Sequence, residues 1–148
     1  MGFAVVGQLS TDAQRPSASA SLNGSAGQES QASPDPTLYI PRAHVVEERA
    51  FLHDFMEEYP FVSLITTTPT LRITHIPTIL DRTRGRFGTI RAHISAQNPQ
   101  KAALDSAHPA VVVFRGPHSY ISASWYAVRD SVVPTWNFGV VHASGRPR

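Results

Sequence analysis

The sequence predicts a mainly β fold with short helices, built as a meander or Greek-key barrel. Stretches rich in β-branched residues follow one another with only turns between them, whereas a parallel sheet needs a helical crossover between strands. The chain has 148 residues and a hydrophobic content of 41%, which is enough for one packed domain and a tail.

The first part of the chain, residues 1–36, is predicted to be a disordered tail, and residues 37–148 are predicted to form the domain. From about Gln8 to Pro36 the sequence is mostly Ser, Ala, Gln, Gly and Asp, with almost no aromatic or branched apolar residues. Such a segment cannot bury enough apolar surface to offset the entropy that is lost on ordering.

A helix and three strands are expected in the first half of the domain. After a short extended entry at Thr37, apolar side chains from Val46 to Met56 recur at helical spacing, and Pro60 ends that helix. Richness in β-branched residues or alternation of side chains then predicts strands at 61–68, 71–80 and 86–95.

The second half is expected to hold a short helix and further strands. Asn98 is a good N-cap for the short helix. The apolar run 109–117 predicts a strand buried on both faces or nearly so. We expect the chain to turn at Gly116-Pro117, to return in extended form, and to enter a last strand at Pro134.

Composition and motifs exclude several classes of function. The net charge of +2 and the pI near 9.4 are too small a basic excess to indicate nucleic-acid binding by themselves. The absence of cysteine rules out disulfides, thiolate nucleophiles and cysteine-ligated metals. The sequence contains no G-x-S-x-G elbow, no glycine-rich phosphate loop and no paired-carboxylate signature. No apolar run is long enough to span a bilayer and no signal peptide is evident, so we expect a cytoplasmic protein without membrane contact.

One stretch has the pattern of an anion site. Arg91 and His93 are two residues apart on a predicted strand and would share one face. The short helix that follows, from Asn98 and Pro99, would expose unpaired N–H groups beside these basic side chains, where a phosphate would fit. The alternative is an exposed strand face followed by an ordinary helix cap.

Other basic residues give weaker signals. His75 and His93 on neighbouring strands could contribute to a metal site, but three or four ligands are needed and no HxH or HExxH motif is present. We therefore expect no metal. Arg82, Arg84 and Arg86 lie together in a predicted turn, either as a solvated hairpin tip or as contacts to nucleic-acid phosphates.

Aromatic residues gather late in the chain, interleaved with small polar residues. Flat side chains beside small hydrogen-bonding ones suit a planar heteroaromatic ligand or a subunit interface, and equally a barrel core with satisfied Trp and Tyr tips. The residues concerned are Tyr120, Trp125, Tyr126, Trp136 and Phe138.

Five blocks of this sequence, in order, resemble the PaiB family of FMN-binding negative transcriptional regulators. The blocks are YIPR at Tyr39–Arg42, THIP at Thr74–Pro77, RAHISAQNPQ at Arg91–Gln100, FRGPHSYISASWY at Phe114–Tyr126, and VPTWNFGVVHASGR at Val133–Arg146. The resemblance implies an FMN-binding split β-barrel, FMN as cofactor, a homodimer with flavin at the subunit interface, and a role in repressing genes.

The resemblance also implies a set of cofactor-binding residues, with no catalytic residue and no metal. On the phosphate side they are Arg91, His93, Ser95, Asn98 and Gln100. On the ring side they are Thr74, His75, Trp125, Trp136 and Asn137.

Departures from the family pattern leave alternatives open. Lys101 stands where the family usually has tryptophan, and family members continue for tens of residues beyond Gly145, so we expect a domain that is C-terminally truncated relative to the family. One alternative is an FMN-dependent oxidoreductase of the pyridoxamine-phosphate oxidase or flavin reductase type. Another is a truncated remnant that binds nothing. With no recognition helix in view, DNA contact is expected to be weak or indirect.

Overall fold

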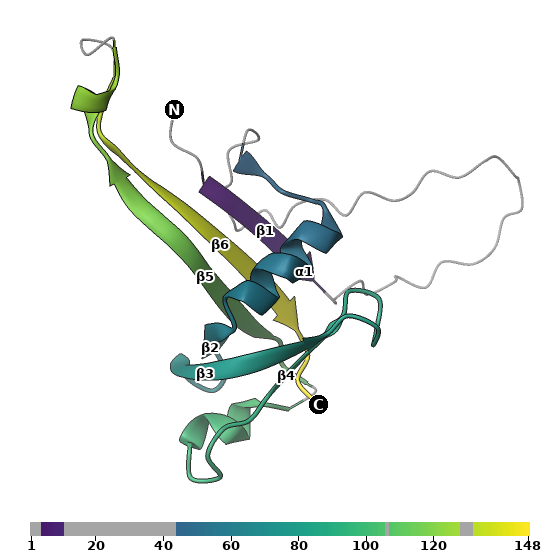
Figure 1. Ribbon diagram of the computed structural model, residues 1–148. Coiled ribbons are helices and arrows are strands. Elements are labelled where there is room, and N and C mark those ends of the chain that lie inside the picture. The colour runs from purple at the N-terminus through teal and green to yellow at the C-terminus, as the bar shows by residue number, and fades with distance from the viewer. Residues whose placement is uncertain (1–3, 11–43, 106, 128–131) are drawn as a thin grey trace, which may run out of the picture.

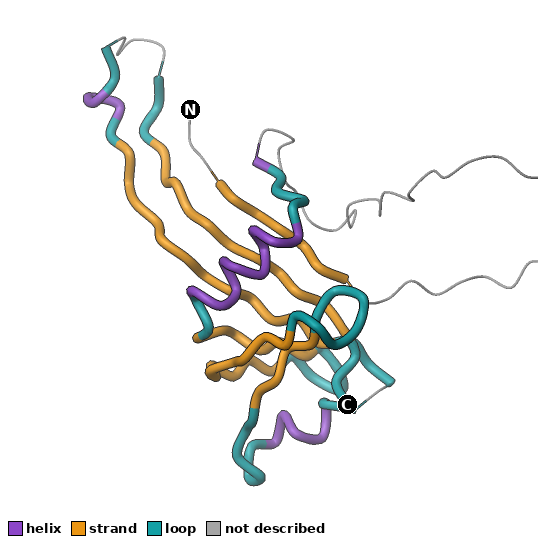
Figure 2. The backbone as a smooth tube through the Cα atoms, turned by 45° about the vertical axis from the view of Figure 1, so that its right-hand side comes forward, coloured by secondary structure: helices purple, strands orange, loops and turns teal. Residues whose placement is uncertain are grey.

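The computed structural model describes residues 4–10, 44–105, 107–127 and 132–148. Its elements in chain order are β1 (Ala4–Ser10), α1 (Arg49–Glu58), β2 (Phe61–Thr66), β3 (Arg72–Asp81), β4 (Thr89–Ala92), the 3₁₀ helix η2 (Pro99–Ala103), β5 (Ala110–Ile121), the 3₁₀ helix η3 (Ala123–Trp125) and β6 (Thr135–Gly145). Figure 1 shows one twisted sheet with α1 lying across it, and Figure 2 shows the same helix crossing the strands.

The strands form one six-stranded sheet in the order β1-β6-β5-β2-β3-β4. β1 runs parallel to β6, and the other neighbours are antiparallel. The predicted mainly β fold with short helices is therefore confirmed, and the sheet is open rather than closed into a complete barrel. Among the described helices, none combines the length and the apolar character that crossing a bilayer requires.

The N-terminal segment differs from the expectation over part of its length. Residues 4–10, which lie inside the segment expected to be disordered, form β1 and pair with β6 from Ala4 opposite Phe138 to Ser10 opposite Ser144. The rest of that segment, residues 1–3 and 11–36, lies outside the described residues.

The hydrophobic core lies between α1 and one face of the sheet. Leu52 and Met56 are four residues apart, so they point the same way from the helix, and both are buried. They pack against Phe114 of β5 and Val141 of β6, which are also fully buried. Alternation along the strands places these two residues on the side of the sheet that faces the helix.

Two glycines allow α1 to approach the sheet closely. A Cβ atom added to Gly116 would lie 2.4 Å from Cζ of Phe55, and one added to Gly139 would lie 2.9 Å from its Cε2. The phenyl ring of Phe55 thus occupies the space that side chains at these two strand positions would need. The ring also contacts Tyr59, with ring centroids 4.9 Å apart.

The prediction of a turn at Gly116-Pro117 is wrong, because β5 continues through this dipeptide. Arg115 pairs with Val140 and His118 pairs with Phe138, so two residues of β5 stand opposite one residue of β6. This is a β-bulge, which accommodates a proline that cannot donate a ladder hydrogen bond. β5 and β6 therefore form one long hairpin, whose far end extends beyond the rest of the sheet (Figure 1).

The turn between β3 and β4 is attached to α1 by an ion-pair network. The guanidinium of Arg82 donates to Asp54 at 2.7 Å and to both oxygens of Glu57 at 2.6 and 2.8 Å. The hydrogen bond from Arg82 is the main reason that the pKa of Glu57 is lowered. A second contact joins the helix to this turn: Nε2–H of the buried His53 donates to the carbonyl oxygen of Phe87 at 3.0 Å. The turn and the helix are thus held together.

We predict that Gly116→Ala destabilises the protein by about 1–3 kcal/mol, the usual cost of forcing extra atoms into a packed core. The double variant Gly116→Ala/Phe55→Leu should recover part of this loss, because the shorter side chain leaves room for the methyl group. Urea unfolding of the two variants and of the wild type measures both effects. A Gly116→Ala variant as stable as the wild type would contradict the close packing.

Candidate functional site

The sheet face opposite α1 is the candidate site, and we call it the open face. Strand alternation and pairing assign its members. Two of them, His118 and Phe138, also line a groove beside α1. They are Phe61, Ser63, Ile65, Ile73, His75, Pro77, Ile79, Asp81, Thr89, Arg91, Val111, Val113, Arg115, His118, Tyr120, Trp136, Phe138, Val140, His142 and Ser144. The strand 109–117, expected to be buried on both faces, is covered by α1 on one face only. Phe61 is 67% exposed and Ile79 is 68% exposed, so large apolar groups of this face meet solvent.

The charges on the open face are almost all of one sign. It carries the guanidinium groups of Arg91 and Arg115, together with three histidines. Asp81 is the one acidic residue within strands β2 to β6. Its carboxylate already accepts hydrogen bonds from Thr83 N and Oγ1, at 3.1 and 2.8 Å, and these bonds lower its pKa. The face as a whole is suited to an anion.

A cross-strand row connects two of the histidines. His75 pairs with Ser63, Ser63 pairs with Val113, and Val113 pairs with His142. Because neighbouring strands are about 4.8 Å apart, His75 and His142 are separated by roughly 14 Å across this row. Nδ1 of His75 lies 3.0 Å from the Ser63 hydroxyl. Arg115 follows two residues after Val113 and is therefore a diagonal neighbour of His142, at a Cα distance of about 7–8 Å.

His142 has an altered acidity. Its side chain is half-buried on the open face, and desolvation lowers its pKa from the ordinary value of 6.5. The imidazole is thus neutral at neutral pH, where it can donate one hydrogen bond and accept another. The positive charge on this part of the face therefore comes from Arg115.

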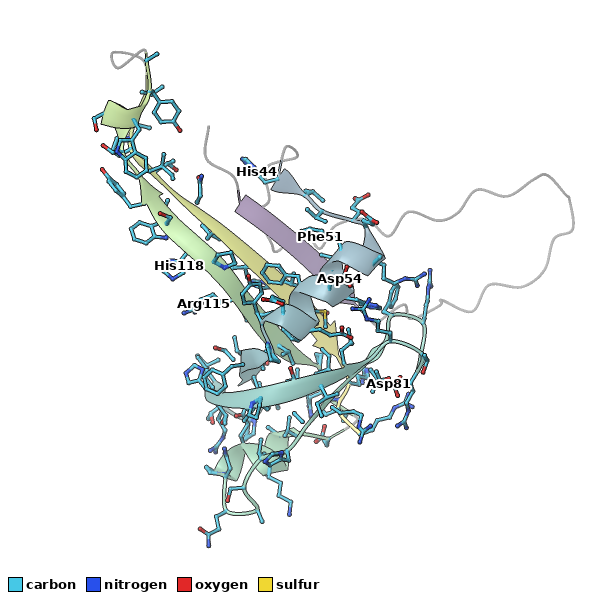
Figure 3. All side chains as sticks on the ribbon, in the orientation of Figure 1. His44, Phe51, Asp54, Asp81, Arg115 and His118 are labelled. Atoms are coloured by element: carbon cyan, nitrogen blue, oxygen red, sulfur yellow. The ribbon has the colours of Figure 1, made fainter. Side chains whose placement is uncertain are left out.

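Aromatic rings continue the open face along the projecting hairpin. Nε1–H of Trp136 donates to Nδ1 of His118 at 3.2 Å, and the two rings stack with centroids 5.7 Å apart. The ring of Tyr120 also neighbours that of Trp136, with centroids 6.1 Å apart. The indole of Trp136 is 52% exposed. Figure 3 shows Arg115 and His118 projecting from the same strand on the side away from α1.

Three of the predicted site residues form a hydrogen-bonded cluster that holds the fold together. Asn98 Nδ2 donates to Thr74 Oγ1 at 3.0 Å, and Thr74 Oγ1 donates to Gln100 Oε1. Gln100 is 1% exposed, and its Nε2 lies 3.2 Å from Thr66 Oγ1 and from the carbonyl oxygens of Leu64 and Arg72. The carboxamide of Gln100 is thus fully used within the chain.

The other predicted phosphate-side residues are exposed, but only Arg91 of them lies on a strand. Arg91 pairs with Ile79 and lies on the open face. β4 ends at Ala92, so strand alternation does not place His93 on the same face. Ser95 is exposed in the following loop, where its hydroxyl accepts from Gln97 N at 3.2 Å. The predicted helix N-terminus is a 3₁₀ helix of 5 residues, with Asn98 as its cap.

The predicted ring-side residues are dispersed. His75 lies on β3 and Trp136 on β6, both on the open face. Trp125 is 68% exposed in η3, at the tip of the long hairpin. Asn137 neighbours Trp136 and therefore points to the α1 side, where it lines an apolar groove of about 470 Å³ with Phe51 and Phe55.

The sheet brings to the open face three residues that were not predicted from the sequence, namely Arg115, His118 and His142. Arg72 was not predicted either, and its buried Nε has no hydrogen-bond partner within the described chain. A buried guanidinium N–H without a partner is unusual. The sequence signal available for Arg115 was its place in FRGPH, where an arginine interrupts an apolar strand. No cluster of three or more metal-binding side chains occurs among the described residues.

Known proteins resemble this chain over most of its domain. A family model described as "putative FMN-binding domain" matches residues 38–148. Protease synthase and sporulation protein PAI 2 of Bacillus subtilis (strain 168) is 34% identical over 110 residues, which cover 74% of this chain and 52% of that protein. An uncharacterized protein of Aspergillus fumigatus is 30% identical over 144 residues, covering 74% of this chain and 55% of that protein. The chain spans about half the length of the curated relatives it matches.

We predict that Gln100→Leu lowers the free energy of unfolding by about 1–3 kcal/mol, because it leaves buried partners such as Thr74 and Thr66 without their hydrogen bonds. The affinity of the folded protein for FMN should change little. Chemical unfolding and flavin titration of the same sample measure the two quantities. Unchanged stability with much weaker flavin binding would instead place Gln100 in the flavin site.

We predict that the stability of the protein falls as pH drops below 6.5, the ordinary pKa of histidine, partly because of His142. The unfolded imidazole then binds a proton that the desolvated native imidazole resists, so protonation favours unfolding. His142→Gln should flatten this part of the Tm profile between about pH 7 and pH 5.5. Carboxylates titrate mainly below that range and contribute equally to both proteins. Identical profiles for the variant and the wild type would contradict the prediction.

Proposed function

The chain belongs to this FMN-binding family, its cofactor is FMN, and from that premise we propose that it is a flavin-binding cytoplasmic regulator of transcription whose flavin lies on the open face. The observation that carries the proposal is the combination of Arg91 and Arg115 with exposed aromatic rings on one uncovered sheet face. FMN needs cations for its phosphate and flat apolar groups for its ring, and this face offers both.

Different residues of the open face would bind the phosphate and the ring of FMN. Arg115 is the candidate for binding the phosphate, since a guanidinium donates two parallel hydrogen bonds to phosphate oxygens. Arg91 lies on β4, three strands away, and would add positive charge to the face without sharing that contact. The stacked pair of His118 and Trp136 is the candidate wall for the ring. His75 lies on β3, between Arg115 of β5 and Arg91 of β4 in the strand order, and would contribute a hydrogen bond. Bound FMN supplies a redox-active ring, and the residues of this chain bind and orient it.

The regulatory role rests on kinship and on the lack of obvious catalytic groups. The Bacillus relative has protease synthase and sporulation in its name, and the PaiB resemblance extends this to control of gene expression. Within the described residues, the carboxylates lie on α1, at strand ends and in loops, and none lies beside Arg115 or His118. A regulator that binds flavin without turning it over fits this arrangement.

DNA contact, if direct, would be weak and sensitive to salt. Arg82, one of the three arginines in the β3–β4 turn, is paired with Asp54 and Glu57. Arg86 lies over the ring of Phe87, with its Cζ atom 4.9 Å from the ring centroid. Of the three arginines, Arg84 is therefore the most available to a DNA phosphate, and a single phosphate contact contributes little affinity for DNA.

The second candidate function is a flavin-dependent oxidoreductase of the same fold. The observation that favours it is exposure: a flavin on the open face would be accessible to a nicotinamide donor. Absorbance at 340 nm with NADPH, FMN and the purified protein distinguishes the two functions. Sustained NADPH oxidation above that of free FMN supports the enzyme, whereas retention of flavin without turnover supports the regulator.

We predict that Arg115→Ala weakens FMN binding about tenfold or more, as expected for loss of a charge-assisted hydrogen bond worth about 1.5–3 kcal/mol. Riboflavin, which lacks the phosphate, should bind the variant and the wild type equally. Flavin fluorescence titration measures both ligands.

The matched control for this titration is Arg84→Ala, which removes an exposed arginine outside the open face and should leave FMN affinity unchanged. If Arg115→Ala and Arg84→Ala bind FMN as tightly as the wild type, the placement of the phosphate on Arg115 is wrong.

A further inference from the structure

β1 is attached to the domain differently from the other strands. It pairs with β6 in parallel, from Ala4 opposite Phe138 to Ser10 opposite Ser144. No other described strand pairs with it, so β1 forms one edge of the sheet (Figure 1). Among the described elements, β6 is also the only one with which β1 makes more than isolated contacts. One partner strand therefore holds β1, through the backbone hydrogen bonds of a parallel ladder.

Several properties of β1 make this attachment weak. A parallel pair is slightly less stable per residue than an antiparallel pair. The free energy that is lost on ordering one residue is similar in size to the net gain from one hydrogen bond. Val5 and Val6 favour an extended backbone, but Gly7 disfavours it. A strand of 7 residues at a sheet edge is thus close to balance between its bound and released states.

β1 lies outside the part of the chain that the family shares. The family model matches residues 38–148, whereas β1 ends at Ser10. Within the matched residues, β6 pairs with a described strand on one side only, and that strand is β5. The N-terminal segment of this chain supplies the strand on the other side. β1 is therefore an addition to the shared domain rather than one of its own strands.

The connection between β1 and the domain is long, because residues 11–43 separate Ser10 from His44. A segment tethered in this way is presented to its own binding edge at an effective concentration on the order of a millimolar or less. A free peptide must outcompete that concentration while β1 is docked. Once β1 has been prevented from docking, the free peptide binds with its full intrinsic affinity.

We propose that the outer edge of β6 is a binding site for an extended peptide, and that residues 4–10 occupy it as a reversible intramolecular ligand. The ligand is a short peptide strand that runs parallel to β6 and pairs through its backbone, which is the mode of β-strand addition. When residues 4–10 detach, the edge accepts the same sequence from a separate peptide. This site uses the backbone groups at the edge of the sheet, whereas the proposed flavin site uses side chains of the open face.

Hydrogen–deuterium exchange of the full chain tests whether β1 detaches by itself. We expect the amides of residues 4–10 to exchange at least tenfold faster than those of β5 around Phe114, because local release exposes β1 while the domain stays folded. Equal protection of the two segments would overturn the proposal, since β1 would then open only when the whole domain unfolds.

The binding edge is tested with a fluorescently labelled peptide of sequence AVVGQLS, whose binding to the full chain is followed by anisotropy. Val5→Pro/Val6→Pro removes two adjacent backbone N–H groups from the tethered strand, so the ladder to β6 loses a donor. We expect this variant to bind the peptide at least tenfold more tightly than the wild type. Ala18→Pro/Ser19→Pro is the matched control, with two prolines outside β1, and should bind the peptide as the wild type does.

A second peptide, which carries the changes Val5→Pro and Val6→Pro itself, should bind neither the wild type nor the double-proline variant. Equal binding of AVVGQLS to the double-proline variant and to the wild type would refute the proposal. Loss of the folded circular dichroism spectrum in that variant would refute it as well, because the domain would then depend on β1. Neither result bears on FMN binding, which is titrated separately and tests the proposed function.

Discussion

The closeness with which α1 lies against β5 and β6 determines which side of the sheet is the inside. Phe55 fits over Gly116 and Gly139 because neither residue has a side chain. With the helix in that position, Leu52 and Met56 reach the core and are removed from water. Because side chains alternate along a strand, the residues next to those that face the helix point to the other side of the sheet. The position of the open face and of its arginines therefore depends on how the ring of Phe55 is accommodated.

The β-bulge in β5 gives the open face its composition. Arg115 and His118 are three residues apart, and regular alternation would send them to opposite faces. The extra residue in the bulge brings both to the same face, opposite Val140 and Phe138. It also turns Tyr120 toward Trp136. A cation and a group of aromatic rings are thereby collected on one surface, a combination that local sequence order does not suggest.

Much of the fold could be predicted from local patterns, because the helix and the strands have the expected periodicity. In β3, for example, Ile73 and His75 are exposed while Ile76 and Thr78 are buried. The turn predicted at Gly116-Pro117 does not form, because pairing with β6 overrides the local preference of this dipeptide for a turn. The parallel pairing of β1 with β6 joins segments more than 100 residues apart and has no local signal.

The candidate site was less predictable than the fold, because its residues come from separate strands. Gln100 and Asn98 have side chains that suit an anion, yet their hydrogen bonds go to Thr74, to Thr66 and to carbonyl oxygens of β2 and β3. His142 becomes a neighbour of Arg115 only through the register of β5 and β6. Such proximity depends on strand pairing over long distances, which neither spacing nor composition reveals.

The scarcity of acidic residues in the strands also affects how fast a ligand arrives. A surface with one sign of charge attracts anions from beyond contact distance and can raise association rates by one or more orders of magnitude. Salt shortens the range of this attraction, to about 8 Å at physiological ionic strength. Because Asp81 is the one carboxylate in strands β2 to β6, the approach of an anionic cofactor would meet little opposing field. The capture rate, more than the release rate, would therefore respond to ionic strength.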